Sequence, residues 1–547
     1  MSMSNNEPVY ITGHQHPDTD SVVSAIAYAL FKRAMGIKAV PCCLGKLSNE
    51  TKYLLDRFGY EEPMLLSDAR KTLKEISYDE PLCVTADKTI METINTMKET
   101  NRPGFAVVDE EKHLIGFISK SDLMDIGLGD TAHGIDLLRQ TSAKNIAKTI
   151  SGQLIYDDPQ MHINGKVSII ALTQSGLENY EIHDRIVIMG DDPEAQIKLI
   201  EKGAGILIVV WTQAIREDVL EAAREHHCPV IISGHGSMNT SRYIYFAPEI
   251  RLVMTQKPVF FRDTDLAEEA GRKMLTTRFR NYPILDSDDH LIGYVSRYHI
   301  MNYQNKKIIL VDHNEFSQSV KAVEKAQILE VVDHHRINDF ATSQPVSFRN
   351  EIVGSTATII ATMYRENQIP IPQKLAGLLL GAVLSDTLLL QSPTTTRKDR
   401  ETANILAALA DLDVETFGRE MFEATASNMN QSIQEMIVQD IKYFEISGCR
   451  TMISQAMVTS THQLWGKERD IQRELNKLVE KKELDLLVAA FTSVSEDGSV
   501  FFAAGEQADK CFEAFPGIED HLHVLQKGIL SRKSQILPEI TRVLNNS

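Results

Sequence analysis

Short apolar runs alternate with amphipathic helical stretches near both ends of the chain. At the start, the run before Gly13 leads into a polar loop and then into SVVSAIAYALFKRAMG, an amphipathic segment that ends at Gly36. From Lys306 the alternation resumes with KKIILVDHNE, ILEVVDHHR and GLLLGAVLSDT. Strands that alternate with helices predict an α/β fold with a parallel sheet.

An internal repeat separates these two parts of the chain. Residues 83–125 and 253–301 share an extended entry, a helix, an Arg/Asn/Pro turn, an apolar strand, a polar hairpin, the tetrapeptide HLIG and a second strand. Self-similarity of this kind indicates two copies of one structural unit. Between the copies, apolar strands such as those in AGILIVVW and CPVIIS alternate with helices, which predicts a further α/β domain.

Composition and charge narrow the classes of function. The 547 residues suggest about three to five domains. A formal net charge of −18 argues against a general nucleic-acid binder and requires that an anionic substrate be attracted locally, by metal ions or clustered Lys/Arg. Six scattered cysteines, a polar N-terminus and the lack of an 18-residue apolar run predict a cytoplasmic protein with no membrane span.

Imidazoles and carboxylates follow several of the apolar runs. The carboxyl ends of parallel strands meet at one edge of a sheet, so these groups are expected to converge. A single aspartate after a strand is more often a helix cap, but the whole set favours a metal site. Mixed His/Asp ligands suit Mn²⁺, Co²⁺ or Fe²⁺ better than Ca²⁺ or structural zinc, and their number predicts two ions ~3.5–4 Å apart. The candidates are His14, Asp18, Asp20, Asp312, Asp333, His334, His335 and Asp386; the last follows GLLLGAVLS, which is either a strand or a buried helix.

The motifs GHQHPDTDS, VDHNE, VVDHHR and SDT resemble those of the DHH phosphoesterase superfamily, and Ser531-Arg532-Lys533 narrows the resemblance to family II inorganic pyrophosphatases. It covers residues 1–66 and 307–547 and implies hydrolysis of pyrophosphate with two Mn²⁺ or Co²⁺ ions and Mg²⁺ arriving with the substrate. The implied metal ligands are His14 and Asp18 on one ion, Asp20 and His334 on the other, Asp312 bridging both, and Asp386 completing the cluster. The implied substrate residues are His335, Lys442, Arg532 and Lys533, with Ser355 contacting phosphate less directly.

The two repeats resemble a pair of CBS motifs, on the strength of HLIGFIS and HLIGYVS, and the domain between them resembles a DRTGG domain. The resemblance implies adenine nucleotides as effectors, with AMP and ADP as inhibitors and ATP or diadenosine polyphosphates as activators, and a homodimer formed through the CBS motifs. Tyr282 either stacks on adenine or packs between the repeats, and His299 stands where an aspartate is usual. The candidate nucleotide contacts are Ser119, Asp122, Arg280, Asn281, Tyr282 and Ser296.

The predicted boundaries are 1–66 and 306–424 for a DHH catalytic domain, 67–130 and 250–305 for the CBS motifs, 131–249 for the DRTGG-like domain and 425–547 for a smaller DHHA2-like α/β domain that binds substrate. Two alternative functions stay open. One is a DHH phosphoesterase that acts on polyphosphate or cyclic dinucleotides. The other is a non-catalytic nucleotide sensor, although none of the expected ligands is missing from the sequence.

Overall fold

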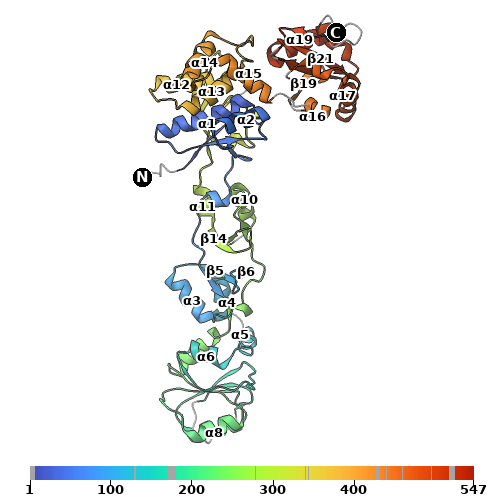
Figure 1. The fold of residues 1–547 in the computed structure, drawn as a ribbon. Coiled ribbons are helices and arrows are strands. Elements are labelled where there is room, and N and C mark those ends of the chain that lie inside the picture. The colour runs from blue at the N-terminus through green and yellow to red at the C-terminus, as the bar shows by residue number, and fades with distance from the viewer. Residues whose placement is uncertain are drawn as a thin grey trace. The chain divides into compact units, whose positions relative to one another are not determined.

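The computed structural model describes residues 7–128, 131–170, 180–277, 279–338, 340–342, 344–425, 432–438, 440–458, 460–493, 496–515 and 524–546. The predicted end of the first CBS motif, at residue 130, lies outside these ranges. The chain divides into two compact units (Figure 1). Unit 1 comprises Met1–Arg70 and Asn305–Ser547, and unit 2 comprises Lys71–Gln304.

The first domain of unit 1 is built on six parallel strands, which confirms the predicted fold class. The strands follow the order β17-β16-β15-β1-β2-β3. The chain runs outward from β1 to β3, leaves for unit 2 and returns as β15 on the other side of β1. This reversal makes the carboxyl ends of β1 and β15 a topological switch point, where open α/β sheets bind ligands. The bounds are β1 (Val9–Thr12), β2 (Ala39–Cys43), β3 (Met64–Leu65), β15 (Lys307–Val311), β16 (Gln327–Asp333) and β17 (Ser347–Asn350).

Side chains alternate between two cores along the central strands. Ile309 and Val311 join the core beneath the helices, whereas Ile308 and Leu310 join a second core on the opposite face, closed by the 3-10 turns η5 (Phe316–Gln318) and η6 (Val323–Lys325). Figure 1 shows the helices α12, α13 and α14 stacked over α1. The bounds are α1 (Thr19–Ala34), α2 (Asn49–Phe58), α12 (Thr356–Glu366), α13 (Gln373–Asp386), α14 (Arg397–Ala410) and α15 (Val414–Thr425).

A buried lysine holds the chain at the point where it leaves unit 1. Lys306, directly before β15, is 6% exposed. Its ammonium donates to the backbone oxygens of Asp68, at 3.2 Å, and Arg70, at 2.8 Å. The departing and returning segments of the chain are therefore held side by side.

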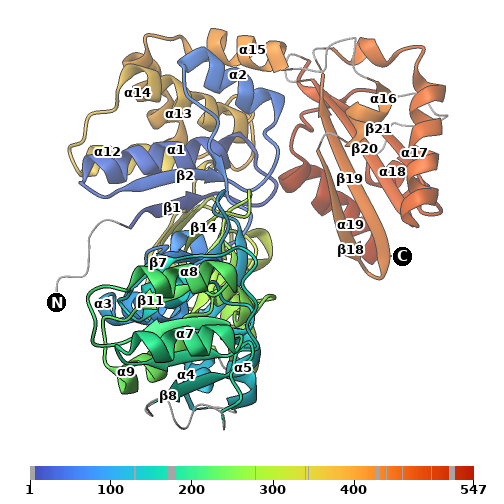
Figure 2. The same cartoon turned by 90° about the horizontal axis from the view of Figure 1, so that it is seen from below.

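The second domain of unit 1 is a five-stranded mixed sheet in the order β18-β19-β20-β21-β22 (Figure 2). The strands β19 and β20 pair in parallel and the other neighbours pair antiparallel. Each face carries its own apolar core, covered by helices. The bounds are β18 (Ile441–Ile446), β19 (Cys449–Met457), β20 (Leu486–Ser493), β21 (Gly498–Ala504), β22 (Gln526–Lys527), α16 (Ile433–Val438), α17 (Glu468–Lys482), α18 (Ala508–Ala514) and α19 (Leu537–Asn545).

The two repeats of unit 2 have the same topology, a parallel strand pair followed by an antiparallel hairpin. The hydroxyl of Tyr294 joins them, because it accepts from the backbone N–H of Ala106 at 2.8 Å and donates to the carbonyl of Leu82 at 2.5 Å. The rings of His113 and His290, from the two HLIG segments, stack at 5.1 Å. The bounds are β4 (Cys83–Thr85), α3 (Ile90–Glu99), β5 (Gly104–Val108), β6 (Leu114–Ser119) and α4 (Lys120–Leu128), then β12 (Phe261–Arg262), α10 (Ala267–Thr276), β13 (Tyr282–Leu285), β14 (Leu291–Val295) and α11 (Arg297–Asn302).

The middle domain of unit 2 is an α/β domain whose strands follow the order β7-β11-β10-β9-β8. It meets the first repeat at an ion pair between Glu92 and Lys148, 2.5 Å apart. Among the described residues of the chain, no helix combines the length and apolar character needed to cross a membrane. The bounds are α5 (Thr131–Leu138), α6 (Ala143–Thr149), β7 (Gln153–Tyr156), β8 (Val167–Ile170), β9 (Ile186–Met189), α7 (Pro193–Glu201), β10 (Ile206–Val209), α8 (Glu217–Glu225), β11 (Val230–Ile232) and α9 (Ser237–Tyr243).

Candidate metal centre

The switch point of the six-stranded sheet brings together the first group of predicted ligands. His14 follows β1, and Asp18 caps α1 by accepting from the backbone N–H of Ser21 at 3.0 Å. Asp312 follows β15 with a φ of 61°, a left-handed conformation that aspartate tolerates. The Nε2 of His14 lies 3.1 Å from Asp18 Oδ2 and 3.6 Å from Asp312 Oδ2. These three side chains can hold one cation.

A second group of ligands lies beside the other oxygen of Asp312. Asp20, His334 and Asp386 offer ligand atoms within 4.8 Å of one another. The Nε2 of His334 lies 3.3 Å from Asp386 Oδ2 and 3.5 Å from Asp312 Oδ1. Each oxygen of Asp312 therefore faces a different histidine, as expected of a carboxylate shared between two ions. Asp386 is the last residue of α13, so a buried helix, and not a strand, delivers it.

The environment of His334 fits a cation. Its Nδ1 lies 3.0 Å from the carbonyl oxygen of Val353, so Nδ1 carries a proton, and Nε2 is the ring nitrogen that can bind either a second proton or a metal ion. Among the described side chains, this Nε2 is one of the few buried polar atoms without a hydrogen-bond partner. A buried lone pair that faces carboxylates is stabilised when a positive charge lies between them. The donor set therefore suits a divalent ion of the Mn²⁺ or Co²⁺ type.

The pKa values of the cluster reflect an excess of negative charge. Burial opposes protonation of His14, but Asp18 and Asp312 raise its pKa to about 9. The same balance, with Asp312 and Asp386 as the acidic neighbours, raises the pKa of His334 to about 10. Burial and then the neighbouring carboxylates raise the pKa of Asp20. The cluster thus retains protons as its positive charge, and divalent ions would replace them.

The start of α12 holds the second group in place. The Asp20 carboxylate accepts from Ser355 Oγ at 2.8 Å and from the backbone N–H groups of Thr356 and Ala357 at 2.6 and 3.0 Å. Thr356 Oγ1 also donates to Asp312 Oδ1 at 2.9 Å. The first N–H groups of a helix have no partner within the helix and lie at its positive end, which suits a carboxylate. Ser355, expected to contact phosphate less directly, is fully buried and donates to Asp20.

His335 lies beside the cluster and is more exposed than His334. Its Nδ1 is 2.8 Å from Asp333 Oδ1, and its side chain is 28% exposed, compared with 7% for His334. Asp333 also accepts from Asn314 Nδ2 at 2.6 Å. Burial opposes the charged form of Asp333, but the hydrogen bonds from His335 and Asn314 hold its pKa below its ordinary value. Asp333 thus orients the imidazole of His335.

The three predicted basic residues differ in their surroundings. Burial raises the pKa of Asp18, but His14, and more weakly Lys442, lower it below its ordinary value. Burial likewise raises the pKa of Asp386, against the opposing effects of His334 and Lys533. Both lysines are exposed, and each contributes positive charge near one carboxyl group of the cluster. Arg532, in contrast, is paired with Asp440 at 2.9 Å.

The predicted nucleotide residues lie at strand and helix ends of the repeats. Ser119 Oγ donates to Asp122 Oδ2 at 2.8 Å. In the second repeat, Ser296 Oγ pairs with His299 Nδ1 at 3.0 Å, so the histidine occupies the place of the aspartate. Arg280 is exposed and Asn281 is partly buried, both directly before β13.

Tyr282 lies inside the core of the second repeat. Its side chain is fully buried in the core of the second repeat, against the rings of Phe261 and Phe279. Its hydroxyl is hydrogen-bonded to Thr277 Oγ1. The side chain of Tyr282 therefore packs within one repeat and not between the repeats, because β13 directs it inward.

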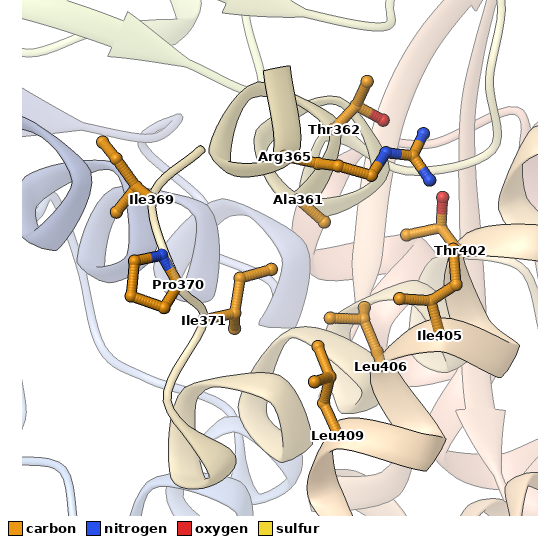
Figure 3. A pocket seen from close by; sticks show the side chains of 10 residues that line it. All are labelled: Ala361, Thr362, Arg365, Ile369, Pro370, Ile371, Thr402, Ile405, Leu406 and Leu409. Atoms are coloured by element: carbon orange, nitrogen blue, oxygen red, sulfur yellow. The ribbon is translucent and has the colours of Figure 1, made fainter. Parts of the chain in front are cut away.

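An apolar pocket lies apart from the metal ligands. It has a volume of about 270 Å³ and is formed by α12, α14 and the segment 369–371 (Figure 3). Its lining includes Ala361, Arg365, Pro370, Ile405 and Leu409, and none of the six predicted ligands. None of the ligand groups described above therefore lines this pocket.

Comparison with known proteins agrees with this arrangement. The family model for the DHH family, N-terminal domain, matches residues 8–383, and that for the DHHA2 domain matches residues 419–543. The chain is 34% identical over 540 residues to the cobalt-dependent inorganic pyrophosphatase of Clostridium perfringens, with 98% of each chain covered. It is 32% identical over 545 residues to the "Probable manganese-dependent inorganic pyrophosphatase" of Thermotoga maritima, again with 98% of each covered.

The regulatory region of Clostridium perfringens pyrophosphatase, solved as CBS and DRTGG domains complexed with the activator diadenosine tetraphosphate, is similar to 41% of this chain. That similarity covers 99% of the solved chain, at 26% identity and a TM-score of 0.39. The family models account for the two domains of unit 1, and the relatives extend over unit 2 as well. The chain therefore belongs to the DHH family and, within it, to the family II inorganic pyrophosphatases.

Proposed function

We propose that this chain hydrolyses inorganic pyrophosphate to two phosphates with Mn²⁺ or Co²⁺ bound at the switch point of its parallel sheet. One observation carries the proposal: the two oxygens of Asp312 face histidines of different ligand groups, His14 of one and His334 of the other. The relatives that extend over 98% of the chain are named as cobalt- and manganese-dependent inorganic pyrophosphatases, which supports the same activity.

We assign His14, Asp18 and Asp312 to one ion, and Asp20, His334, Asp386 and Asp312 to the other. When bound, such a pair of ions polarises phosphoryl oxygens and lowers the pKa of a water between them, and a Mg²⁺ ion would arrive with the substrate. The chain contributes the geometry. Val353 fixes the tautomer of His334, and the start of α12 fixes the orientation of Asp20.

The remaining residues act on the substrate in this proposal. His335, oriented by Asp333, donates to a phosphate oxygen. Lys442 and Lys533 neutralise the charge of the substrate that the metal ions leave uncompensated. Arg532 joins them when a phosphate oxygen competes with Asp440 for its guanidinium, which can bind two oxygens at once.

A phosphate-release assay tests the activity. The purified full-length chain, loaded with Mn²⁺ or Co²⁺, is expected to release phosphate from pyrophosphate much faster than from tripolyphosphate or a cyclic dinucleotide. Faster turnover of either alternative would assign the chain to another class of DHH phosphoesterase. No release from any of the three, together with nucleotide binding, would leave a non-catalytic sensor.

Unit 2 is proposed to regulate the enzyme through adenine nucleotides. The Ser119–Asp122 and Ser296–His299 pairs, with Arg280 and Asn281, are the proposed contacts, and Tyr282 is left out because it is buried. We propose inhibition by AMP and ADP, activation by ATP or diadenosine polyphosphates, and a homodimer formed through the two repeats. Titration of each nucleotide into the phosphate-release assay, combined with light scattering, tests both points.

Two further assignments complete the proposal. The predicted domain boundaries, from 1–66 to 425–547, describe a catalytic domain interrupted by the regulatory insert. The six cysteines are free thiols in the structure, as suits a reducing compartment, and we propose a cytoplasmic location. Fractionation of cells that produce the chain, followed by immunoblotting, tests the location.

A further inference from the structure

The carboxylate of Asp399 lies at the start of α14. It is fully buried and accepts four hydrogen bonds. Two of them come from Thr396, whose backbone N–H and Oγ1 both lie 2.7 Å from Oδ2. These two contacts cap α14, which is the ordinary task of an acidic residue in the first turn of a helix.

The other two hydrogen bonds reach a different segment of the chain. The backbone N–H of Gly354 donates to Asp399 Oδ2 at 2.8 Å, and Thr358 Oγ1 donates to Oδ1 at 2.7 Å. A side chain at position 354 would collide with Thr387, 2.6 Å away, so the backbone approaches closely here. Asp399 is thus hydrogen-bonded to both ends of the short segment 354–358.

The same segment, with the preceding residue, contacts the second group of metal ligands. The carbonyl of Val353 receives the hydrogen bond from His334, and the segment gives three hydrogen bonds to Asp20 and one to the shared Asp312. Neither His14 nor Asp18 has a hydrogen bond to this segment among the contacts described above. The segment therefore connects Asp399 to one of the two ions and to the carboxylate between them.

We propose that Asp399 is a positioning residue for the metal ion held by Asp20, His334 and Asp386. Capping of α14 needs only the two contacts with Thr396. The contacts with Gly354 and Thr358 cross 45 and 41 positions of the chain and fix the segment that orients Asp20 and His334. Removal of the hydrogen-bond partner of a metal ligand commonly weakens metal binding by about 10–100-fold. The inference rests on the proposed function, because it uses the proposed ligand assignment.

Two substitutions at position 399 separate charge from shape. Asp399→Ala removes the acceptor for all four donors and leaves the N–H of Gly354 buried without a partner. Asp399→Asn can place its oxygen where Oδ2 lies and turn its NH₂ group toward the hydroxyl of Thr358, which can accept. The alanine variant should therefore leave segment 354–358 without its hydrogen-bond acceptor, and the asparagine variant should keep most of these hydrogen bonds.

Calorimetric titration of the metal-free full-length chain with Mn²⁺ measures the effect. We expect two binding steps in the unaltered chain, and in Asp399→Ala a weakening of one step by about 10–100-fold with little change in the other. Thr358→Val, which removes one of the four contacts, should weaken the same step by less and keeps the test available if the alanine variant does not fold. In both variants, the spin-coupled electron paramagnetic resonance signal of a Mn²⁺ pair should fall along with the affinity of this binding step.

Asp413→Ala is the matched control. Asp413 accepts from the N–H and Oγ1 of Thr416 at the start of α15, so it also pairs an aspartate with a threonine three positions away, here with the aspartate before the helix and without contacts to segment 354–358. Its loss should lower thermal stability and leave both metal steps unchanged. If the unaltered chain binds no pair of Mn²⁺ ions, the proposed function fails. If it binds two and both Asp399→Ala and Thr358→Val bind them equally well, the role of Asp399 alone is refuted.

Discussion

The Nδ1 atom of His334 lies 3.0 Å from the carbonyl oxygen of Val353, which fixes the imidazole in the tautomer whose Nε2 faces Asp312 and Asp386. The hydrogen bond also sets the angle of the ring, because the accepting carbonyl belongs to the backbone of Val353, which is buried. A metal ligand held in this way is preorganised before any ion arrives.

Replacing His334 by alanine should remove this ligand and one metal ion per chain. We expect metal analysis after dialysis to show about one ion in place of two, and activity on pyrophosphate to fall by at least about 100-fold. His16→Ala is the matched control, because His16 lies exposed in the loop of His14 and outside the ligand groups. Full metal content in His334→Ala would contradict the assignment.

Asp386→Asn should weaken metal binding and activity together. Asparagine keeps the shape of the side chain at the end of α13 but lacks the negative charge that faces His334 at 3.3 Å. We expect Mn²⁺ affinity measured by titration and turnover measured at saturating pyrophosphate to fall in parallel. Unchanged turnover at full metal occupancy would exclude Asp386 from the cluster.

The buried ion pair between Lys32 and Glu330 should contribute to the stability of unit 1. Glu330 accepts from Lys32 Nζ and from the hydroxyl of Tyr28, both at 2.6 Å, and Lys32 is almost wholly buried. Lys32→Met leaves a poorly solvated carboxylate and should cost about 3 kcal/mol, whereas the double variant Lys32→Met/Glu330→Leu should recover much of this loss. Urea unfolding followed by hydrogen exchange in α1 and β16 measures both. An equal loss in the single and double variants would show that packing, and not charge, dominates.

Acid should weaken the contact between the first repeat and the middle domain. Burial alone would raise the pKa of Glu92, but hydrogen bonds from Lys148 and Thr89 lower it to about 2. A carboxyl group whose pKa is lower in the folded state stabilises the fold above its unfolded pKa, and this contribution is lost as the pH falls toward the folded value. Glu92→Gln should therefore lower the melting temperature of unit 2 at about pH 6, with the difference shrinking toward about pH 3.

Glu99→Gln provides the control for this effect, since Glu99 lies exposed at the end of the same helix. Its melting temperature should follow that of the unaltered chain throughout. A constant difference between Glu92→Gln and the unaltered chain across the acid range would refute the role of the Glu92 charge.

The hydroxyl of Tyr294 should hold the two repeats together. Tyr294→Phe leaves the N–H of Ala106 without its acceptor in the interface and should cost about 1–3 kcal/mol. Hydrogen exchange at Ala106 and its neighbours in β5 should become faster. Tyr298→Phe, which alters an exposed tyrosine on α11, should leave exchange unchanged. Equal exchange in the two variants would show that ring packing alone joins the repeats.

Much of the metal centre could be predicted from the sequence because its ligands follow apolar strands. A parallel sheet brings such positions to one edge, so His14, Asp312 and His334 converge whatever the details of the loops. The strand or helix at Leu375–Leu384 could not be decided, since α13 is apolar on all sides and lies among other helices. Periodicity carries no information where every face is buried.

The partners of the ligands could not be predicted because they depend on contacts between distant positions. Asp20 and Thr356 are 336 positions apart, and nothing in the local pattern of either indicates the other. Tyr282 has the same neighbours in sequence whether its ring faces a nucleotide or the core. Pairing of Arg532 with Asp440 likewise depends on two segments 92 positions apart.

Lys306 holds the backbone oxygens of Asp68 and Arg70 at the start of β15, so the chain leaves unit 1 and re-enters it at neighbouring points. A whole module can be spliced in or cut out there without disturbing the pairing of any strand in the six-stranded sheet. A single genetic insertion or deletion at this point would thus add or remove the proposed regulatory unit, and an engineer could graft a different sensor onto the same two ends.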